Sequence, residues 1–239
     1  GGLDLRVVAY DFAGLQSELN RHILPDPSFF PYGPDINYIE GSSMDWYEPD
    51  IYGDVFAWGD TRNGWNGDIY VYDHELDIER PITLDEFGQE NPAIFEDKVV
   101  WSDSRNDGGD IYTNNIYGLF EERLTTNEST QQFPDIYGSW VVFEDDRNGN
   151  LDIYAKNLAT NEERQLVDNG SDQTRPSIYG DSVIWLDSRN GNQRDVYSYN
   201  FTTGITRQLI TGSSKKYKPT LYENYASWGE DDPESGRQQ

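Results

Sequence analysis

Residues 145–154 read DDRNGNLDIY, and three related stretches occur elsewhere in the chain. They are DTRNGWNGDIY at 60–70, DSRNDGGDIY at 103–112 and DSRNGNQRDVY at 187–197. Self-similarity at a regular spacing is the sequence signature of repeat architectures, in which every copy forms the same local structure. The four stretches therefore predict a protein built from repeated units, each containing one such segment.

The repeat has a nearly constant length. One proline marks each unit, at spacings of 43, 42, 42 and 43 residues: Pro49, Pro92, Pro134, Pro176 and Pro219. Nine positions after each proline stands an aromatic residue: Trp58, Trp101, Phe143, Trp185 and Trp228. A period near 42 residues matches one blade of four strands in a β-propeller.

One unit can be divided into strands by its residue types. The segments FPDIYG at 133–138 and WVVFED at 140–145 are rich in aromatic and β-branched residues, as strands are. Asn-Gly in the following RNGN tolerates the positive φ of a tight hairpin turn. LDIYAKNL and ERQLV supply two more strands, and no segment has a helical period. Five such units predict an all-β, five-bladed β-propeller with four antiparallel strands in each blade.

The fifth unit ends after its second strand, so we expect the N-terminus to complete it. RVVAYD at 6–11 resembles DIYVYD at 68–73, and RHIL at 21–24 resembles RPITL. A ring closed by strands from both ends has no open edge between its first and last blades. The predicted single domain 1–239 divides into blade 1 at 49–84, blade 2 at 92–125, blade 3 at 134–168, blade 4 at 176–211, blade 5 at 219–239 plus 1–24, and an enlarged loop at 25–48.

Composition limits the partners of this protein. A net charge of −26 argues against nucleic acid, whose binding needs basic residues to displace counterions. No apolar run approaches the length of a membrane span, so we expect no direct membrane insertion. The chain has no cysteine and hence neither disulfides nor thiolate chemistry. Such an acidic surface suits a secreted or cell-surface protein that meets salt or divalent cations.

The repeat resembles the TolB-type (WD40-like) propeller repeats. The resemblance rests on the proline-containing first strand, the aromatic-rich second strand and the R-N-G…D-[IV]-Y segment, and it covers nearly the whole chain. The sequence departs from that group at the first strand, where PxIYG replaces the usual Trp-Ser-Pro-Asp-Gly turn. This variant is similar to copies in archaeal and bacterial cell-surface proteins. The resemblance implies a fold and an extracellular setting, not one activity.

The opening stretch has two interpretations. Oxygen-bearing side chains at alternate positions resemble a hard-cation loop, so calcium is one of them. The other is a structural lock, in which an arginine beside the turn binds the carboxylates that flank it. We favour the lock and predict no metal and no other cofactor. The predicted arginines, each with its chief partner, are Arg62 with Asp68, Arg105 with Asp110, Arg147 with Asp152 and Arg189 with Asp195.

The fifth copy breaks the pattern of charges. Asp232 stands where the other units have arginine, and Arg6 precedes VVAYD where the others have aspartate. We expect these two residues to face each other across the closure with exchanged charges, in a solvated pair that fixes strand register.

A ligand site is predicted around the fifth blade. The enlarged loop ends near Trp46 and Tyr47, and Trp65 lies in an unusual turn of blade 1. Three of the five lysines gather in KKYK, which contributes Lys215, Lys216, Tyr217 and Lys218. Aromatic and cationic side chains together suit a sugar that carries a carboxylate or sulfate. A lid over the propeller and a patch that offsets nearby acids remain the structural alternatives for these two features.

Catalysis has weaker support. There is no GxSxG nucleophile motif. Asp50, Glu90 and Asp135 lie on predicted first strands, where an acid–base pair for glycoside cleavage is conceivable. The sequence therefore favours a non-catalytic binding propeller for a glycan or a surface protein. A glycoside hydrolase or polysaccharide lyase is the first alternative, and a structural surface-layer element the second.

Overall fold

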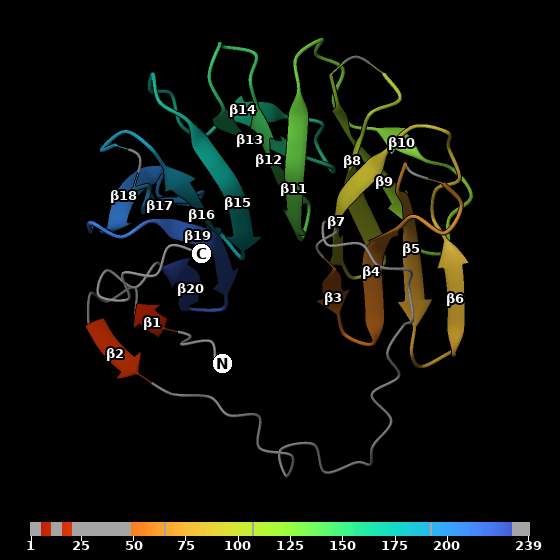
Figure 1. Cartoon of the computed structure of the whole chain (residues 1–239), viewed down its shortest axis with the longest axis horizontal. Coiled ribbons are helices and arrows are strands. Elements are labelled where there is room, and N and C mark those ends of the chain that lie inside the picture. The colour runs from red at the N-terminus through yellow and green to blue at the C-terminus, as the bar shows by residue number, and fades with distance from the viewer. Residues whose placement is uncertain are drawn as a thin grey trace.

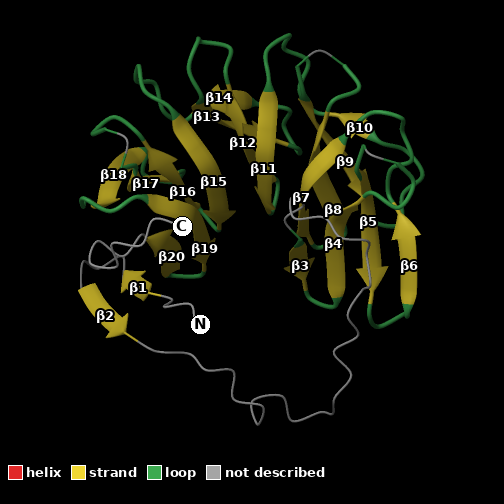
Figure 2. Cartoon of the chain, in the orientation of Figure 1, coloured by secondary structure: helices red, strands yellow, loops and turns green. Residues whose placement is uncertain are grey.

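The computed structural model of the chain describes residues 6–10, 16–20, 49–64, 66–106, 108–191 and 193–230. Its regular elements are all strands (Figure 2). These described segments include no helix long and apolar enough to cross a bilayer. The all-β class predicted from the sequence is confirmed.

Four antiparallel sheets of four strands follow one another along the chain, each in sequential order. Within each sheet, hairpins join strands that are neighbours in sequence. The first sheet contains β3 (Asp50–Tyr52), β4 (Val55–Asp60), β5 (Asp68–Asp73) and β6 (Ile78–Pro81). The second contains β7 (Gln89–Phe95), β8 (Lys98–Asp103), β9 (Asp110–Asn115) and β10 (Glu122–Arg123). The third contains β11 (Gln131–Tyr137), β12 (Trp140–Asp145), β13 (Asp152–Asn157) and β14 (Glu163–Gln165). The fourth contains β15 (Gln173–Tyr179), β16 (Ser182–Asp187), β17 (Asp195–Asn200) and β18 (Ile205–Ile210).

Two further sheets have two strands each. One pairs β19 (Lys216–Tyr222) with β20 (Tyr225–Glu230), and the other pairs β1 (Arg6–Tyr10) with β2 (Gln16–Asn20). The second N-terminal strand thus lies earlier than the expected 21–24. Strands β1 and β20 are in contact but belong to separate sheets, so a single closed fifth blade stays a prediction.

The sheets follow one another around an arc (Figure 1). Their first strands, which are β3, β7, β11, β15 and β19, line the inside of this arc and come together around one hollow. Hairpin turns of the RNGN type lie at the end where these first strands begin, since Gln131 is paired with Asp145. A side chain near the start of each first strand therefore lies close to one face of the molecule.

The core lies between neighbouring sheets. The second-strand aromatic residues Trp101, Phe143 and Trp185 are fully buried, as the repeat pattern requires. Trp185, for example, packs with Val142 and Ile153 of the preceding sheet. Large aromatic side chains bury enough area to build a core from a chain with few aliphatic residues. Each sheet is thus held by the next one, and function must be sought at the edges and along the inner strands.

Candidate functional site

The arginines of the RNGN turns are paired with carboxylates of their own hairpins. In each of the four complete sheets an arginine Nη2 lies 2.5–2.6 Å from a carboxylate of its own hairpin. The partner is the aspartate that ends the second strand, not the one that begins the third. The pairs are Arg62 with Asp60, Arg105 with Asp103, Arg147 with Asp145 and Arg189 with Asp187. The chief partners expected from the sequence, Asp68, Asp110, Asp152 and Asp195, are therefore corrected.

The same arginines stack on tyrosines of the third strand, with Cζ 4.1–4.6 Å from the ring centroids. In the third sheet, Asn148 Nδ2 donates to Tyr154 Oη at 3.0 Å and to Asp152 at 3.1 Å. The asparagine of the turn therefore takes the role at Asp152 that was expected of the arginine. The physical reason is the orientation of the side chain, because an arginine stacked over the tyrosine ring directs its guanidinium back to the second strand.

In the first sheet the arginine also affects the ionisation of its aspartate. Burial by itself would raise the pKa of Asp60, but the hydrogen bonds from Arg62 and Trp58 hold it below its ordinary value. The pKa of Arg62 is raised in return, chiefly by its hydrogen bond to Asp60. The side chains that resembled a cation loop are thus engaged with one another, which supports the structural interpretation of the motif.

We predict that Arg147→Ala lowers the free energy of unfolding by about 1–3 kcal/mol, because it leaves the buried Asp145 without its cation. Denaturant titration followed by tryptophan fluorescence measures this loss. Arg207→Ala, which removes the same charge from an exposed position, should cost less than about 0.5 kcal/mol. Equal losses in both variants would contradict a locking role.

The inner strands enclose the best candidate for a binding site. A hollow of about 210 Å³, called here the axial hollow, is lined by the proline of each first strand and its immediate neighbours. All five first strands contribute to it. The lining residues are Pro49 and Asp50, then Asn91 to Ala93, Phe133 to Asp135, Arg175 to Ser177, and Lys218 to Thr220.

A strained backbone points four side chains of different chemistry at this hollow. The residue before the proline has a positive φ in four first strands: Asn91 (54°), Phe133 (51°), Arg175 (56°) and Lys218 (40°). Each lies in a β-bulge, where the strand register shifts. A non-glycine residue in this conformation costs roughly 1–2 kcal/mol. Strain of this kind persists only where the surroundings enforce it, and it gathers at functional sites.

Neighbouring sheets hold the bulges in place. The backbone N–H of Phe133 donates to Ser102 Oγ at 3.1 Å. The N–H of Arg175 donates to Glu144 Oε1 at 2.7 Å. Glu144 is buried, which raises the pKa of its carboxyl. The bulge geometry is thus fixed by side chains that do not line the hollow, so the lining residue itself is free to differ between blades.

Two carboxylates are among the groups that line the hollow. Asp50 Oδ2 accepts from the Ile94 N–H at 2.7 Å, and Asp135 Oδ2 accepts from the Ile178 N–H at 2.8 Å. Burial raises the pKa of both, and with the added repulsion of Asp50 it raises that of Asp135 to about 7. Both carboxylates therefore join one first strand to the next, whatever else they do. Glu90, the third expected carboxylate, is exposed and does not line the hollow.

The lysine segment divides into buried and exposed parts. Lys216 is fully buried, and its Nζ donates to the Ser214 carbonyl at 3.0 Å. It cannot contact a ligand at the surface, so its expected binding role is wrong. Lys215 and Tyr217 are exposed and lie together, with Nζ 5.1 Å from the ring centroid. Lys218 is exposed and lines the axial hollow.

Other expected site residues lie outside the described part of the chain. These are Trp46, Tyr47 and Trp65, together with Asp232. The enlarged loop 25–48 lies outside it as well, and of Arg6 only the backbone is described. Their predicted roles in binding and ring closure stay predictions.

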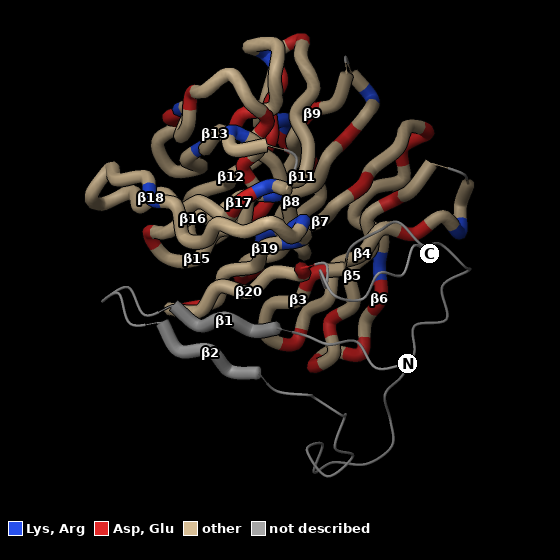
Figure 3. The backbone as a smooth tube through the Cα atoms, turned by 60° about the vertical axis from the view of Figure 1, so that its left-hand side comes forward, with Lys and Arg blue, Asp and Glu red and all other residues tan. Residues whose placement is uncertain are grey.

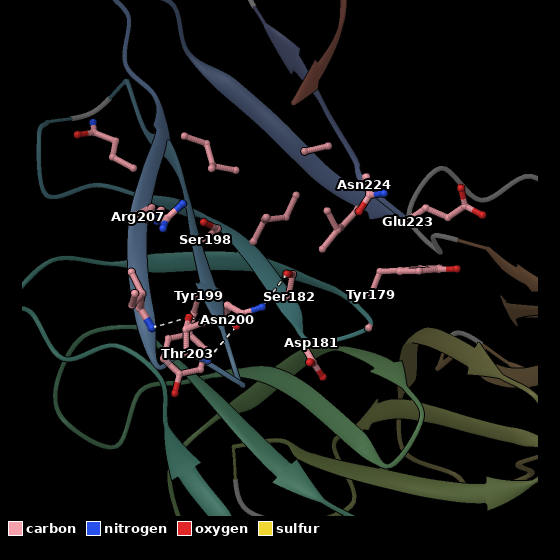
Figure 4. Close-up of a pocket in the computed structure, with 17 residues that line it drawn as sticks. Tyr179, Asp181, Ser182, Ser198, Tyr199, Asn200, Thr203, Arg207, Glu223 and Asn224 are labelled. Carbon is pink, nitrogen blue, oxygen red and sulfur yellow. Dashed lines mark hydrogen bonds between the residues drawn. The ribbon is translucent and has the colours of Figure 1, made fainter. Parts of the chain in front are cut away.

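A larger hollow of about 800 Å³ lies between the fourth sheet and the β19–β20 hairpin (Figure 4). Its lining mixes apolar side chains such as Ile184 and Leu221 with polar ones such as Arg207 and Asn224. It opens where β19–β20 has two strands and the neighbouring sheet has four. We attribute this hollow to the two-stranded sheet and take the axial hollow as the candidate site.

A collar of aromatic side chains closes the inner strands at their far ends. Tyr52, Phe95, Tyr137, Tyr179 and Tyr222 follow one another, with ring centroids 4.5–5.2 Å apart. Neither the collar nor the bulges were foreseen from the sequence. The signal for the collar was the aromatic residue that follows Ile or Leu in each PxIYG segment. An aromatic residue at the same position of every unit brings the rings of neighbouring units into contact.

The geometry described above is that of a propeller-type protein. No family model matches the chain, and no curated protein sequence is similar to it. Several solved structures are similar to the chain in fold. A protein described as TolB from Agrobacterium tumefaciens has a TM-score of 0.63 at 18% identity, over 75% of this chain and 72% of that one. TolB from Acinetobacter baumannii has a TM-score of 0.61 at 16% identity, over 79% of this chain and 55% of that one. A chain of a nidogen–laminin complex has a TM-score of 0.60 at 15% identity, over 76% of this chain and 70% of that one. These likenesses show a TolB-like β-propeller fold.

Proposed function

We propose that this protein is a non-catalytic binding propeller that recognises the anionic end of a glycan or of a partner protein in the axial hollow. One observation carries the proposal. The bulged backbone is the same in four first strands, whereas the side chain it presents changes from asparagine to phenylalanine, arginine and lysine. A constant backbone with variable lining residues is the pattern of a recognition site on a repeated scaffold.

Four charged side chains line the hollow: the carboxyls of Asp50 and Asp135, whose pKa burial raises, and the cations Arg175 and Lys218, to which we assign binding of the anion. Arg175 and Lys218 are contributed by adjacent first strands, in a chain whose acidic residues are spread over many turns (Figure 3). Arg175 Cζ lies 3.8 Å from the Phe133 ring centroid, which holds the guanidinium beside an apolar face. A planar guanidinium is suited to carboxylate, which it can bind through two hydrogen bonds.

The size of the hollow limits what can enter. Drug-sized ligands occupy pockets of about 300–1,000 Å³, and the axial hollow has about 210 Å³. It therefore suits one terminal group, while the rest of the ligand would lie over the exposed Lys215 and Tyr217. A uronate at the end of an oligosaccharide and an acidic side chain of a peptide both meet this requirement.

We predict that replacing Arg175 and Lys218 together by alanine weakens binding of an anionic ligand at least ~10-fold, since hydrogen bonds to charged groups contribute about 1.5–3 kcal/mol each. Calorimetry with an oligouronate, its neutral counterpart and an acidic peptide measures this and separates glycan from protein ligands. Arg207→Ala is the control for net charge. Equal affinity in the wild type and the double variant would refute the site.

A glycoside hydrolase is the second candidate, and the pair of carboxylates favours it. A carboxyl with a raised pKa beside a second carboxylate is the arrangement of a general acid and its partner, and Asp135 and Asp50 have this arrangement. Against it, both carboxylates are hydrogen-bonded to backbone N–H groups. Release of reducing sugar by the wild type but not by Asp135→Asn would favour the enzyme.

We also propose that β1 and β2 complete the sheet of β19 and β20, which would give five blades and close the hollow. The contacts between β1 and β20 support this arrangement. An extracellular or cell-surface setting fits the acidic surface. Cross-linking of cysteines introduced into β1 and β20 tests closure, and surface labelling of intact cells tests the setting.

A further inference from the structure

The four aspartates that begin the third strands lie at equivalent positions but differ in their partners. They are Asp68, Asp110, Asp152 and Asp195, and all are buried. In three sheets the fourth strand supplies a donor, from the residue paired with the tyrosine two positions after the aspartate. These donors are Arg123 to Asp110 at 2.8 Å, Gln165 to Asp152 at 2.9 Å and Gln208 to Asp195 at 2.8 Å.

The first sheet lacks this donor. Pro81 is paired with Tyr70, in the position that Arg123, Gln165 and Gln208 hold in the other sheets. A proline has no side-chain donor. Asp68 Oδ2 accepts from Asn63 at 3.0 Å, but Oδ1 is buried and has no hydrogen-bond partner among the described residues. A buried carboxylate oxygen without a partner is costly, so a group that the protein does not supply is expected beside it.

A second buried oxygen without a described partner belongs to a residue whose backbone contacts the neighbour of Asp68. Gln89, which begins the second sheet, is fully buried, and its N–H donates to the Gly67 carbonyl, next to Asp68. Its Nε2 donates to the Phe87 carbonyl at 2.6 Å, and its Oε1 has no partner within the described structure. The opposite amide orientation would set Oε1 against the Phe87 carbonyl oxygen. The Oε1 atoms of Gln131 and Gln173, which begin the next two sheets, also have no partner within the described structure, so the unpartnered Asp68 Oδ1 is what distinguishes the interface of the first and second sheets.

The interface between the fourth sheet and β19 shows which kind of group fits at the equivalent position. Lys216 has the place of Gln89: its N–H donates to the Gln193 carbonyl at 3.2 Å. Its Nζ lies 3.9 Å from Asp195 Oδ1, the counterpart of Asp68 Oδ1. Gly212 makes room, since a Cβ there would lie 3.4 Å from Nζ. The corresponding position in the first interface is Asp85. The interface between the fourth sheet and β19 therefore has its own positive charge, the Lys216 ammonium, beside the aspartate.

The local charge favours a cation beside Asp68. Burial raises the pKa of Asp68, and the negative charges of Asp60 and Asp85 add to this effect. Asp60 is paired with Arg62, and Asp85 lies 3.9 Å from Arg105 Nη1. Arg105 is shared with Asp103 and Glu121, so the charge around Asp68 remains negative and favours a bound cation. No three carboxylate or imidazole groups gather at metal-binding distance in the described segments, so a divalent ion would be poorly matched.

We propose that Asp68 and Gln89 bind a monovalent metal cation, Na⁺ or K⁺, between the first and second sheets. Carboxylate and amide oxygens are the hard ligands that such cations prefer. The ion at this interface has the role that the Lys216 ammonium has between the fourth sheet and β19. This site is separate from the axial hollow, and the inference does not depend on the proposed function.

The test is thermal unfolding of the full chain in NaCl or KCl and in tetramethylammonium chloride at equal ionic strength. Constant ionic strength keeps the screening of the net charge unchanged. We expect the wild-type midpoint to be about 2–4 °C higher with the metal cations, the size of shift that a modest binding energy gives a chain of this length. Pro81→Gln restores the donor found in the third and fourth sheets, so its midpoint should not depend on the cation.

Two further variants test the proposal independently, in case Pro81→Gln does not fold. Asp68→Asn removes the charge and should abolish the dependence, whereas Asp152→Asn, the matched change in the third sheet, should leave it intact. An equal dependence in Asp68→Asn and the wild type would overturn the proposal. So would a response to micromolar Ca²⁺ that Asp68→Asn loses, which would indicate a divalent site. A wild-type midpoint that does not depend on the cation and falls only as pH rises would show that Asp68 carries a proton instead of binding a cation.

Discussion

Replacing Lys216 by alanine should lower the free energy of unfolding by about 3–5 kcal/mol, the cost of removing one partner from a buried ion pair. Its Nζ lies 3.9 Å from both Asp195 Oδ1 and Glu230 Oε1. Glu230 stands where the other sheets end their second strand with an aspartate, yet the residue two positions later is Asp232 and not arginine. The buried lysine therefore provides the cation that the hairpin arginine provides in the complete sheets.

Equilibrium unfolding in urea, followed by tryptophan fluorescence, measures the loss in Lys216→Ala. Lys215→Ala is the matched control, since that neighbour is exposed, and it should change stability by less than about 0.5 kcal/mol. Lys216→Gln adopts the residue of three other sheets and should fit, but it removes the positive charge beside Asp195 and Glu230 and should recover only part of the loss. Similar stability in Lys216→Ala and Lys215→Ala would contradict the pairing.

The second large effect concerns pH. The pKa of Asp135 is raised to about 7 by burial and by the charge of Asp50. A carboxyl whose pKa is raised on folding stabilises the folded state fully below its ordinary value near 4, and this stability is lost as pH rises to about 7. At 1.36 kcal/mol for each unit, the loss amounts to about 4 kcal/mol. The contribution of Asp135 to stability should therefore decline across this range.

Asp135→Asn isolates this effect from the other acids of the chain. The difference in unfolding free energy, variant minus wild type, should increase from pH 4 to pH 7 and then level off. Asp54→Asn removes an exposed charge and should show a small difference that depends little on pH. A difference that stays constant with pH in Asp135→Asn would mean that Asp135 is ionised in the folded protein at no cost.

The repeat predicted much of the fold because its signals are local. Proline, aromatic and turn residues recur at fixed positions, and the four-stranded antiparallel sheets follow from them. The predicted carboxylate partner of the hairpin arginine was wrong because two aspartates flank each turn at similar distances in sequence. Stacking of Arg147 on Tyr154 selects between them, and spacing alone contains no information about such stacking.

The candidate site was less predictable. Lys216 looks like a surface residue in KKYK, but the register Lys216↔Glu230 places it at a sheet interface. The bulges were hidden because a residue before proline is normally extended, whereas Arg175 has a φ of 56°. Glu90 and Asp135 were predicted at comparable positions, but Glu90 lies before the bulge of its strand and Asp135 lies after the bulge of its own. Burial in each case is decided by contacts between units, which one unit of sequence does not describe.

The aromatic collar gives this protein a built-in optical signal. Each of its four ring contacts joins one sheet to the next, from Tyr52 through to Tyr222. Aromatic rings held at fixed mutual angles produce circular dichroism in the near ultraviolet, and this signal disappears when packing loosens although strands persist. The near-ultraviolet spectrum therefore reports separation of neighbouring sheets, while the far-ultraviolet spectrum reports the strands themselves. Comparing the two during unfolding distinguishes a chain whose blades part first from one that melts as a whole.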